Sequence, residues 1–339
     1  FVTGLSSKSW RQLKSDPYAP LTNKAISGLY APGSTFKMVV CLAALEAGIV
    51  APDHRVLCRG HTELGNERFH CWKDSGHGWQ DMYDALQNSC DVYFYDIAKR
   101  VGVDRIGEMA NRLGLGAKTG IDLPSEKGGT IPTRAWKKAL IGTPWQQGET
   151  LISGIGQGFN LTTPLQLAVM TARIANGGKA VTPRLIRPVD EEGKEVEPVF
   201  NDLGISKRSL AVVREGMNRV TNVWRGTAYQ ARISDEGMEM SGKTGTVQVR
   251  RISKAERDNR VLENHERPWR DRDHSLFVGY APSDNPRYAA AVVVEHGGNG
   301  SKVAAPIARD LLLETQKRDP ANRRVQPVAA KASDKSKET

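Results

Sequence analysis

The sequence lacks any long uninterrupted apolar segment. Its longest uncharged apolar run, Met38 to Leu45, is far shorter than the roughly 18 to 20 residues that cross a bilayer. It also lacks an internal repeat and an N-terminal stretch in which positive charges precede an apolar core. We therefore expect no membrane span within this chain, and any targeting or anchoring segment to lie outside it.

Features that favour nucleic-acid binding are also scarce, although the formal net charge is +10. Residues 317–339 carry much of that excess without apolar periodicity, which predicts a disordered basic tail. The stretch 250–273 mixes eight positive with six negative residues. Without a basic face and interleaved aromatic residues, we expect no nucleic-acid partner.

The apolar content is ordinary for a globular protein, and its periodicity predicts a mixed α/β (α+β) fold. Gly154-Ile-Gly-Gln-Gly158 has the wrong spacing for a dinucleotide fingerprint. Residues 51–77 lack periodicity and are expected to form a loop. Helices are expected at 34–47, 79–87, 91–100, 104–113, 164–177, 206–221 and 303–316. Strands are expected at 238–249, 275–281 and 288–295. We expect an antiparallel sheet flanked by helices, in one domain over 1–316, with further sheet-completing strands upstream of Phe1.

Three short motifs occur in order: Ser34-Thr-Phe-Lys37, Ser89-Cys-Asp91 and Lys243-Thr-Gly-Thr246. A serine hydroxyl is a weak nucleophile unless a nearby base takes its proton. Positions i and i+3 share one face of a helix, so Lys37 can reach Ser34. A lysine acts as a base only when its pKa falls, and Lys243 is the candidate second cation that would lower it.

The remaining motif residues suit the binding of an acyl substrate. The backbone N–H of Ser34, at a helix N-terminus, would face a developing oxyanion. Gly245 would let a substrate backbone lie close to the strand. The hydroxyls of Thr244 and Thr246 can bind a terminal carboxylate.

The four cysteines, at positions 41, 58, 71 and 90, all lie in the first third of the chain. An even number favours disulfides in an oxidising compartment, whereas clustering beside histidines favours a metal site. The number of cysteines alone leaves both readings open.

These motifs resemble those of the penicilloyl serine transferase superfamily. Within it, the chain resembles the penicillin-binding protein 2 family, the class B D,D-transpeptidases of cell elongation, over about residues 1–316. The matching segments are Tyr30-Ala-Pro-Gly-Ser-Thr-Phe-Lys37, Ser89-Cys-Asp-Val-Tyr-Phe-Tyr95, Gly154–Gly158, Gly226-Thr-Ala228 and Ser241-Gly-Lys-Thr-Gly-Thr-Val-Gln-Val249. The resemblance implies the penicillin-binding transpeptidase fold, with a helical subdomain beside the sheet.

The resemblance implies that Ser34 attacks the D-Ala-D-Ala carbonyl of a peptidoglycan stem peptide and passes the acyl group to a neighbouring amine. β-Lactams would acylate the same serine. By position, Lys37 is the general base, Ser89 the proton relay and Lys243 the electrostatic partner, while Ser34 and Thr246 N–H groups form the oxyanion hole. No cofactor is needed for this chemistry.

The same resemblance implies a setting and partners. The domain would be periplasmic and belong to a protein anchored in the inner membrane, with the anchor and a pedestal domain outside this chain. Its partners would be a glycan-polymerising membrane protein and other cell-elongation proteins.

Asp91 stands where the wider superfamily usually has Asn. An ionised carboxylate accepts hydrogen bonds but cannot donate to a substrate carbonyl as an amide does. It also favours protonated Lys37 or Lys243. Asp91 remains a candidate substrate-binding residue, and whether it contacts substrate directly is left open.

Two other functions share these motifs, a serine β-lactamase and a penicillin-sensing receptor domain. A β-lactamase must hydrolyse its acyl-enzyme quickly, and no segment stands out as supplying a deacylating carboxylate. The fate of a labelled penicillin separates the three.

A structural zinc is expected at Cys58, Cys71, His77 and Cys90, a Cys₃His set. Some relatives that the chain resembles bind zinc next to the second motif, where Cys90 stands; Cys58 and Cys71 are inferred from this chain. The alternative is a Cys58–Cys71 disulfide with the other two residues free. His70 is the alternative nitrogen ligand, and Cys41 is expected in the core.

Overall fold

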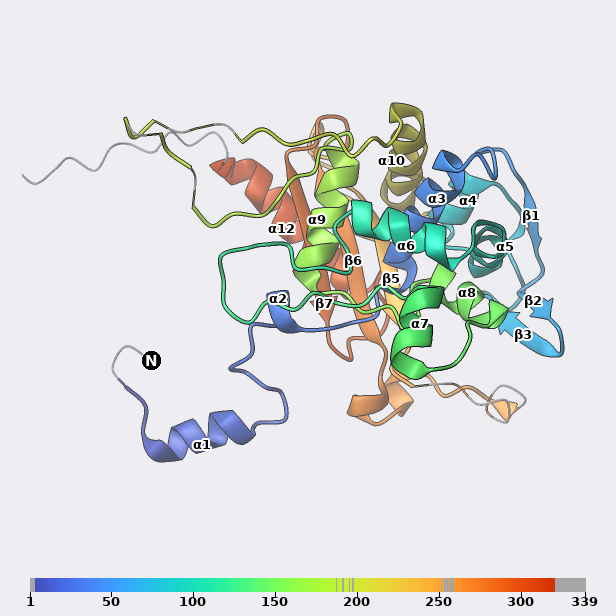
Figure 1. Cartoon of the computed structure of the whole chain (residues 1–339), viewed down its shortest axis with the longest axis horizontal. Coiled ribbons are helices and arrows are strands. Elements are labelled where there is room, and N and C mark those ends of the chain that lie inside the picture. The colour runs from blue at the N-terminus through green and yellow to red at the C-terminus, as the bar shows by residue number, and fades with distance from the viewer. Residues whose placement is uncertain are drawn as a thin grey trace, which may run out of the picture.

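The computed structural model describes residues 4–320, with gaps at 187, 191, 195, 197, 251, 253–255 and 257–258. A three-stranded antiparallel sheet lies at its centre, in the order β5 (Ser241–Val247), β6 (His274–Ala281) and β7 (Tyr288–Val294). All three strands fall within the ranges that the sequence predicted or begin one residue earlier. The predicted fold class, an antiparallel sheet flanked by helices, is confirmed (Figure 1).

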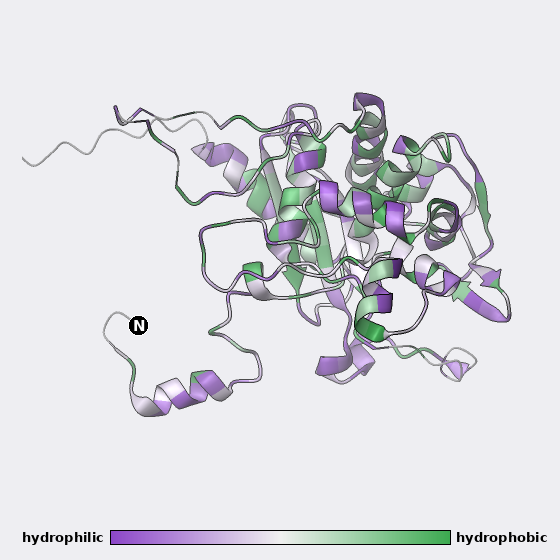
Figure 2. Cartoon of the chain, viewed as in Figure 1, coloured by the Kyte–Doolittle hydropathy of each residue, from purple (hydrophilic) through white to green (hydrophobic). Residues whose placement is uncertain are grey.

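Side chains alternate along the strands, so the sheet presents apolar residues on both faces, and each face packs against a separate hydrophobic cluster. On β6, Leu276 and Val278 join the larger core, together with residues of 37–46 and 91–101. Phe277 and Ala281 point the other way, into a second cluster with α12 (Ala304–Arg318). Figure 2 shows hydrophobic residues along the strands and hydrophilic ones on the outer faces of many helices.

Helices cover the sheet and build a second region beside it (Figure 1). The helices that pack on the strands are α9 (Pro164–Ala175), α10 (Lys207–Asn222) and α12. The second region contains α3 (Lys37–Glu46), α4 (Met82–Gln87), α5 (Asp91–Val101), α6 (Val103–Arg112), α7 (Arg134–Ile141) and α8 (Gln147–Gly154). Near the N-terminus lie α1 (Ser7–Ser15) and α2 (Lys24–Ser27). The helices α1, α2, α7 and α8 were not predicted from the sequence.

Helix starts follow the capping residues that the sequence displays. The Thr163 hydroxyl accepts from the Gln166 N–H while the Gln166 side chain accepts from the Thr163 N–H, a capping box ahead of Pro164. Ser206 caps α10 in the same way through Ser209 N–H. These two predicted helix starts are confirmed.

The loop expected over 51–77 holds strands instead. Strand β1 (Val56–Cys58) pairs with β4 (Gly78–Gln80), and β2 (His61–Leu64) pairs with β3 (Glu67–His70), both antiparallel. The strands are three or four residues long and mostly half-exposed, so they carry no clear alternation. Because residues 78–80 pair with β1, the helix expected from residue 79 begins only at Met82, after its cap Asp81.

The boundary predicted for the basic tail is wrong by a few residues. Helix α12 continues to Arg318, and Asp319 accepts a hydrogen bond from the Tyr288 hydroxyl at 2.6 Å. The rest of the predicted tail, residues 321–339, lies outside the described residues. Among the residues described, none of the helices is both long enough and apolar enough to span a bilayer.

Candidate active site

Ser34 lies in a short 3₁₀ turn, η1 (Gly33–Phe36), that leads directly into α3. Gly33 has a positive φ of 53°, and its N–H donates to the Gly156 carbonyl at 2.9 Å. A Cβ on Gly156 would lie 2.1 Å from the Gly33 oxygen, so only glycine permits this approach. The Gly154–Gly158 segment therefore packs directly against the turn that carries Ser34 and holds it by a backbone hydrogen bond.

Lys37 follows Ser34 by one helical turn and is fully buried. Its Nζ donates to three oxygens: the Ser89 carbonyl at 2.9 Å, the Ser89 hydroxyl at 3.1 Å and Asp91 Oδ1 at 2.7 Å. Three contacts match the three hydrogens of an ammonium group. The structure thus brings the first two sequence motifs together through Lys37. Within the described part of the chain, no hydrogen bond joins the Ser34 hydroxyl to another group.

Ser89 and Asp91 lie at the junction of α4 and α5. Ser89 has a left-handed φ of 52°, and Asp91 is the first residue of α5. The second carboxylate oxygen of Asp91 accepts from the Trp72 backbone N–H at 3.0 Å. Burial raises the pKa of Asp91, against the opposing charge of Lys37.

Lys243 lies on β5, with no exposed surface, and its Nζ donates to the Thr244 carbonyl at 3.2 Å. Burial, and then the neighbouring Lys37 ammonium, hold the pKa of Lys243 well below its usual value. Lys243 is thus a lysine whose ammonium form this site disfavours.

The glycine of the third motif has a packing reason that the sequence analysis did not anticipate. A Cβ on Gly245 would lie 3.2 Å from Thr35 Cγ2 and 3.4 Å from the Pro32 oxygen. Gly245 therefore lets the serine turn pack closely on β5. This close packing brings the third motif beside the first.

The two threonines of the third motif differ in their surroundings. The Thr244 hydroxyl is buried and lies 2.9 Å from the Thr227 hydroxyl. Thr246 is exposed, and its hydroxyl accepts from the Gly300 N–H at 3.2 Å. Thr227 belongs to the Gly226-Thr-Ala228 segment, but nothing in the sequence indicates its contact with Thr244.

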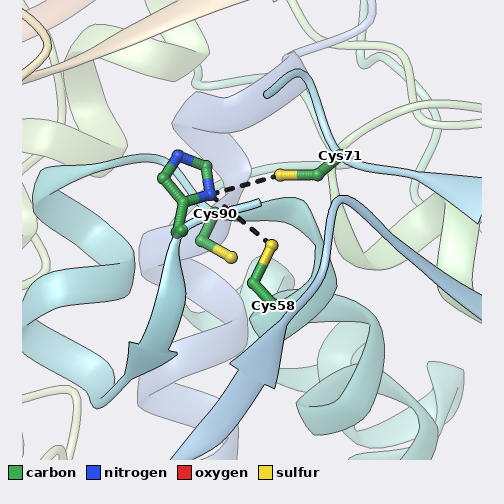
Figure 3. Close-up of side chains that lie close together, drawn as sticks. Cys58, Cys71 and Cys90 are labelled. Carbon is green, nitrogen blue, oxygen red and sulfur yellow. Dashed lines mark hydrogen bonds between the residues drawn. The ribbon is translucent and has the colours of Figure 1, made fainter. Parts of the chain in front are cut away.

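The four predicted metal ligands converge on one point (Figure 3). Their ligand atoms all lie within 4.8 Å of one another. The His77 Nδ1 atom is 3.6 Å from Cys58 Sγ and 3.5 Å from Cys71 Sγ. A tetrahedral zinc with ordinary Zn–S and Zn–N bonds separates sulfur from nitrogen by about 3.6 Å. The residues therefore fit such an ion, and Cys90 completes the set.

The structure also locates the remaining cysteine and histidine candidates. All four cysteines of the chain lie within the described residues, and none of them forms a disulfide. Cys41 is fully buried in the core, as expected. His77 lies in the cluster, whereas His70 lies in β3 opposite His61.

The thiols of the cluster influence one another. Hydrogen bonds with Cys71 and Cys90 lower the pKa of the Cys58 thiol, and the same network raises that of Cys90. The His77 Nε2 atom is buried without a hydrogen-bond partner among the described residues. Thiols bind a cation as thiolates, so metal binding at this cluster would release protons.

Comparisons with known proteins agree with this arrangement. The family model "Penicillin binding protein transpeptidase domain" matches residues 4–313. The chain is 36% identical to the peptidoglycan D,D-transpeptidase MrdA of Haemophilus influenzae over 320 residues, covering 92% of this chain and 48% of that protein. The chain therefore spans about half the length of the curated relatives it matches.

Solved structures give the same result. The crystal structure of Pseudomonas aeruginosa PBP2 in complex with WCK 5153 is 38% identical, with a TM-score of 0.80, over 92% of this chain and 67% of that one. The complex between PBP2 and MreC from Helicobacter pylori is 32% identical, with a TM-score of 0.81, over 93% of this chain and 55% of that one.

Proposed function

Because the chain belongs to the penicillin-binding protein transpeptidase domain family, we propose that it is the catalytic part of a peptidoglycan D,D-transpeptidase that acts in cell elongation. Ser34 attacks the carbonyl between the two terminal D-Ala residues of a stem peptide. The terminal D-Ala leaves, and the acyl group passes to an amine of a neighbouring stem. β-Lactams acylate Ser34 as mimics of that peptide.

One observation carries this proposal. The Lys37 ammonium, one turn after Ser34, binds both the Ser89 hydroxyl and the Asp91 carboxylate in a buried site that also contains Lys243. A nucleophile, a nearby amine, a hydroxyl relay and a second cation are the parts that acyl transfer through a serine needs.

The two buried lysines handle the proton of Ser34. Two ammonium groups in one buried site repel each other, so the pair releases one proton readily. The lowered pKa of Lys243 supports this step. Because Lys243 is the lysine that gives up its proton, a proton shift from Lys37 to Lys243 then produces a neutral Lys37 amine. This amine accepts the Ser34 proton, while the ammonium now on Lys243 attracts the substrate carboxylate.

Neighbouring groups deliver the proton to the leaving amine and stabilise the negative charge that develops on the carbonyl oxygen. Ser89, whose hydroxyl lies 3.1 Å from Lys37 Nζ, relays the proton to the leaving nitrogen. The backbone N–H groups of Ser34 and Thr246 receive the developing oxyanion. The hydroxyls of Thr244 and Thr246 bind the terminal carboxylate.

Asp91 acts as the charge partner of Lys37. Both of its carboxylate oxygens are already engaged, one by Lys37 and one by the Trp72 N–H. This arrangement favours an indirect role over a direct bond to substrate.

A structural zinc completes the proposed site. Cys58, Cys71, His77 and Cys90 would hold it as a closed tetrahedron, with no open position for chemistry. When bound, the ion would cross-link the paired strands β1 and β4, the residue that follows β3 and the N-cap of α5. The acyl transfer itself uses only the side chains and backbone described above.

The proposed setting follows from the family. The domain faces the periplasm, in a protein anchored in the inner membrane. Its substrates are stem peptides of nascent glycan strands, so it works beside a glycan-polymerising membrane protein. The complex of a similar PBP2 with MreC supports further partners among the cell-elongation proteins.

Incubation with a labelled penicillin, followed by intact-mass measurement, tests the proposal. A transpeptidase retains a stable adduct, and Ser34→Ala removes it without unfolding the protein. Rapid turnover of penicillin would indicate a β-lactamase instead. An adduct that persists on Ser34→Ala would refute the nucleophile. A stable adduct without cross-linking of stem peptides, in protein joined to its remaining domains, would favour a receptor.

A further inference from the structure

Ser89 adopts a backbone conformation that needs external support. Its φ of 52° lies in the left-handed region, which is unfavourable for a residue with a Cβ. Such conformations persist where the surrounding structure holds them in place. The groups that hold Ser89 therefore contribute to the geometry of the proposed proton relay.

Two donors converge on the Ser89 carbonyl. One is Lys37 Nζ at 2.9 Å, and the other is the indole N–H of Trp72 at 3.0 Å. The same indole N–H also lies 3.0 Å from the Asn88 carbonyl. The Trp72 indole thus binds two consecutive carbonyls, those of Asn88 and Ser89.

Trp72 holds the other end of the motif with its backbone. Its N–H donates to Asp91 Oδ2, whose partner oxygen binds Lys37. It follows Cys71 directly in the chain, and its ring packs edge-on against His77 at a centroid distance of 5.2 Å. Trp72, next to the metal-ligand candidate Cys71, therefore contacts the residues on both sides of Cys90.

Core packing does not explain this tryptophan. Its relative exposure is 60%, and it lies in a bend outside the strands. Burying a large ring stabilises a fold, but an exposed ring contributes little in that way. Its anchored parts are the indole N–H and the backbone N–H.

We propose that Trp72 is a positioning residue for acyl transfer, holding Ser89 and Asp91 in the orientation that Lys37 requires. This inference rests on the proposed function. Loss of the indole N–H leaves the Ser89 carbonyl with Lys37 as its remaining side-chain donor. The relay serine then samples other orientations, and fewer encounters with a bound substrate lead to acylation.

Trp72→Phe tests the role because it keeps an aromatic ring and removes the indole N–H. Trp79→Phe is the matched control, since Trp79 lies seven residues further on, in β4, with 56% exposure, and its indole has no hydrogen bond within the described residues. Stopped-flow acylation by a chromogenic cephalosporin separates the acylation rate constant from the dissociation constant of the preceding complex. Melting temperature and zinc content are measured on the same samples.

For Trp72→Phe we expect an acylation rate constant about three- to tenfold lower, the effect of one lost hydrogen bond, with the dissociation constant unchanged. Trp79→Phe should match the wild type. An unchanged rate constant would overturn the proposal, and so would a weaker complex with normal acylation. A parallel loss of melting temperature or zinc would show a structural role instead. If the wild type itself is not acylated, the proposed function fails rather than the role of Trp72.

Discussion

Lys37 and Asp91 form a buried ion pair, with Nζ 2.7 Å from Oδ1 and no exposed surface on the lysine side chain. The pair joins the first residue of α3 to the first residue of α5. A buried charge is tolerated only when it is paired and hydrogen-bonded. The pair therefore fixes how the first two sequence motifs meet.

Asp91→Asn should slow acylation by about tenfold or more and lower the free energy of unfolding by about 1 to 3 kcal/mol. Both oxygens of Asp91 accept hydrogen bonds, from Lys37 and from Trp72, whereas an amide offers one oxygen. One of the two donors therefore loses its acceptor, and Lys37 loses its counter-charge. Cephalosporin acylation kinetics and urea unfolding measure the two effects.

Asp96→Asn provides the matched control. Asp96 lies on the same helix, where its partly exposed carboxylate pairs with Arg100 at 2.7 Å. Its removal should leave acylation unchanged and shift stability by less than about 1 kcal/mol. Equal kinetics for Asp91→Asn and Asp96→Asn would contradict the role of the buried pair.

Lys243→Met should reduce acylation by about a hundredfold while leaving the melting temperature unchanged or higher. The lowered pKa of Lys243 shows that its ammonium is disfavoured in this site, so an apolar chain of similar length removes an unfavourable charge. The measurement pairs acylation kinetics with thermal unfolding. Normal acylation by this variant would remove Lys243 from the mechanism.

Lys137→Met should give the opposite pattern. Lys137 is also buried, but it pairs with Glu149 at 2.5 Å. Its loss leaves a carboxylate without its partner, which lowers stability. Acylation by the folded variant should stay normal, because this pair belongs to α7 and α8 rather than to the three motifs.

The sequence could predict those parts of the site that depend on local spacing. Ser34 and Lys37 lie one helical turn apart, and Thr163 and Ser206 cap helices through their own side chains. Such features need only a few neighbouring residues. The roles of the other site residues were predicted from the resemblance of the three ordered motifs to a known family.

Contacts between distant segments could not be predicted in the same way. Trp72 meets Ser89 across 17 positions, through a bend in a segment without periodicity. Gly245 faces the serine turn, a packing relation that no local pattern encodes. The contact of Asp91 with Lys37 likewise joins residues 54 positions apart.

Stability should fall as the pH drops below the ordinary pKa of histidine, about 6.5, because of His274. Burial and the neighbouring His296 lower the pKa of His274, with Lys24 acting in the same direction and Glu295 opposing them. The His274 Nδ1 atom accepts from the His296 N–H at 2.9 Å, which requires that nitrogen to be unprotonated. The stabilisation is therefore complete above about pH 6.5 and is lost as the pH falls through the folded-state pKa.

His274→Asn should remove this part of the pH dependence, because the amide oxygen accepts the same hydrogen bond but does not titrate. Urea unfolding at a series of pH values from about 7.5 to about 5.5 compares the two proteins. We expect the wild type to lose more free energy of unfolding over that range. Parallel curves would contradict the prediction, because they would show that His274 has the same pKa in the folded and unfolded states.

Elemental analysis of the purified protein should find about one zinc per chain, held by Cys58, Cys71, His77 and Cys90. The sulfur-to-nitrogen separations of 3.5 and 3.6 Å already match a tetrahedral zinc, so the folded loop needs little rearrangement to bind it. Chelation should lower the melting temperature, because the ion cross-links three segments that otherwise meet through short strands. It should also slow acylation, because Cys90 lies between Ser89 and Asp91.

Cys58→Ser removes a proposed zinc ligand, and Cys41→Ala is the control that removes a cysteine outside the cluster. Cys58→Ser should lose most of the zinc, since a serine hydroxyl is a poor zinc ligand. Cys41→Ala should retain it, because Cys41 is buried in the core outside the cluster. A metal-free wild type whose mass is lower by two hydrogens would indicate a disulfide between two of the cysteines. Because a disulfide would use up two of the three thiolates, that result would exclude the tetrahedral site.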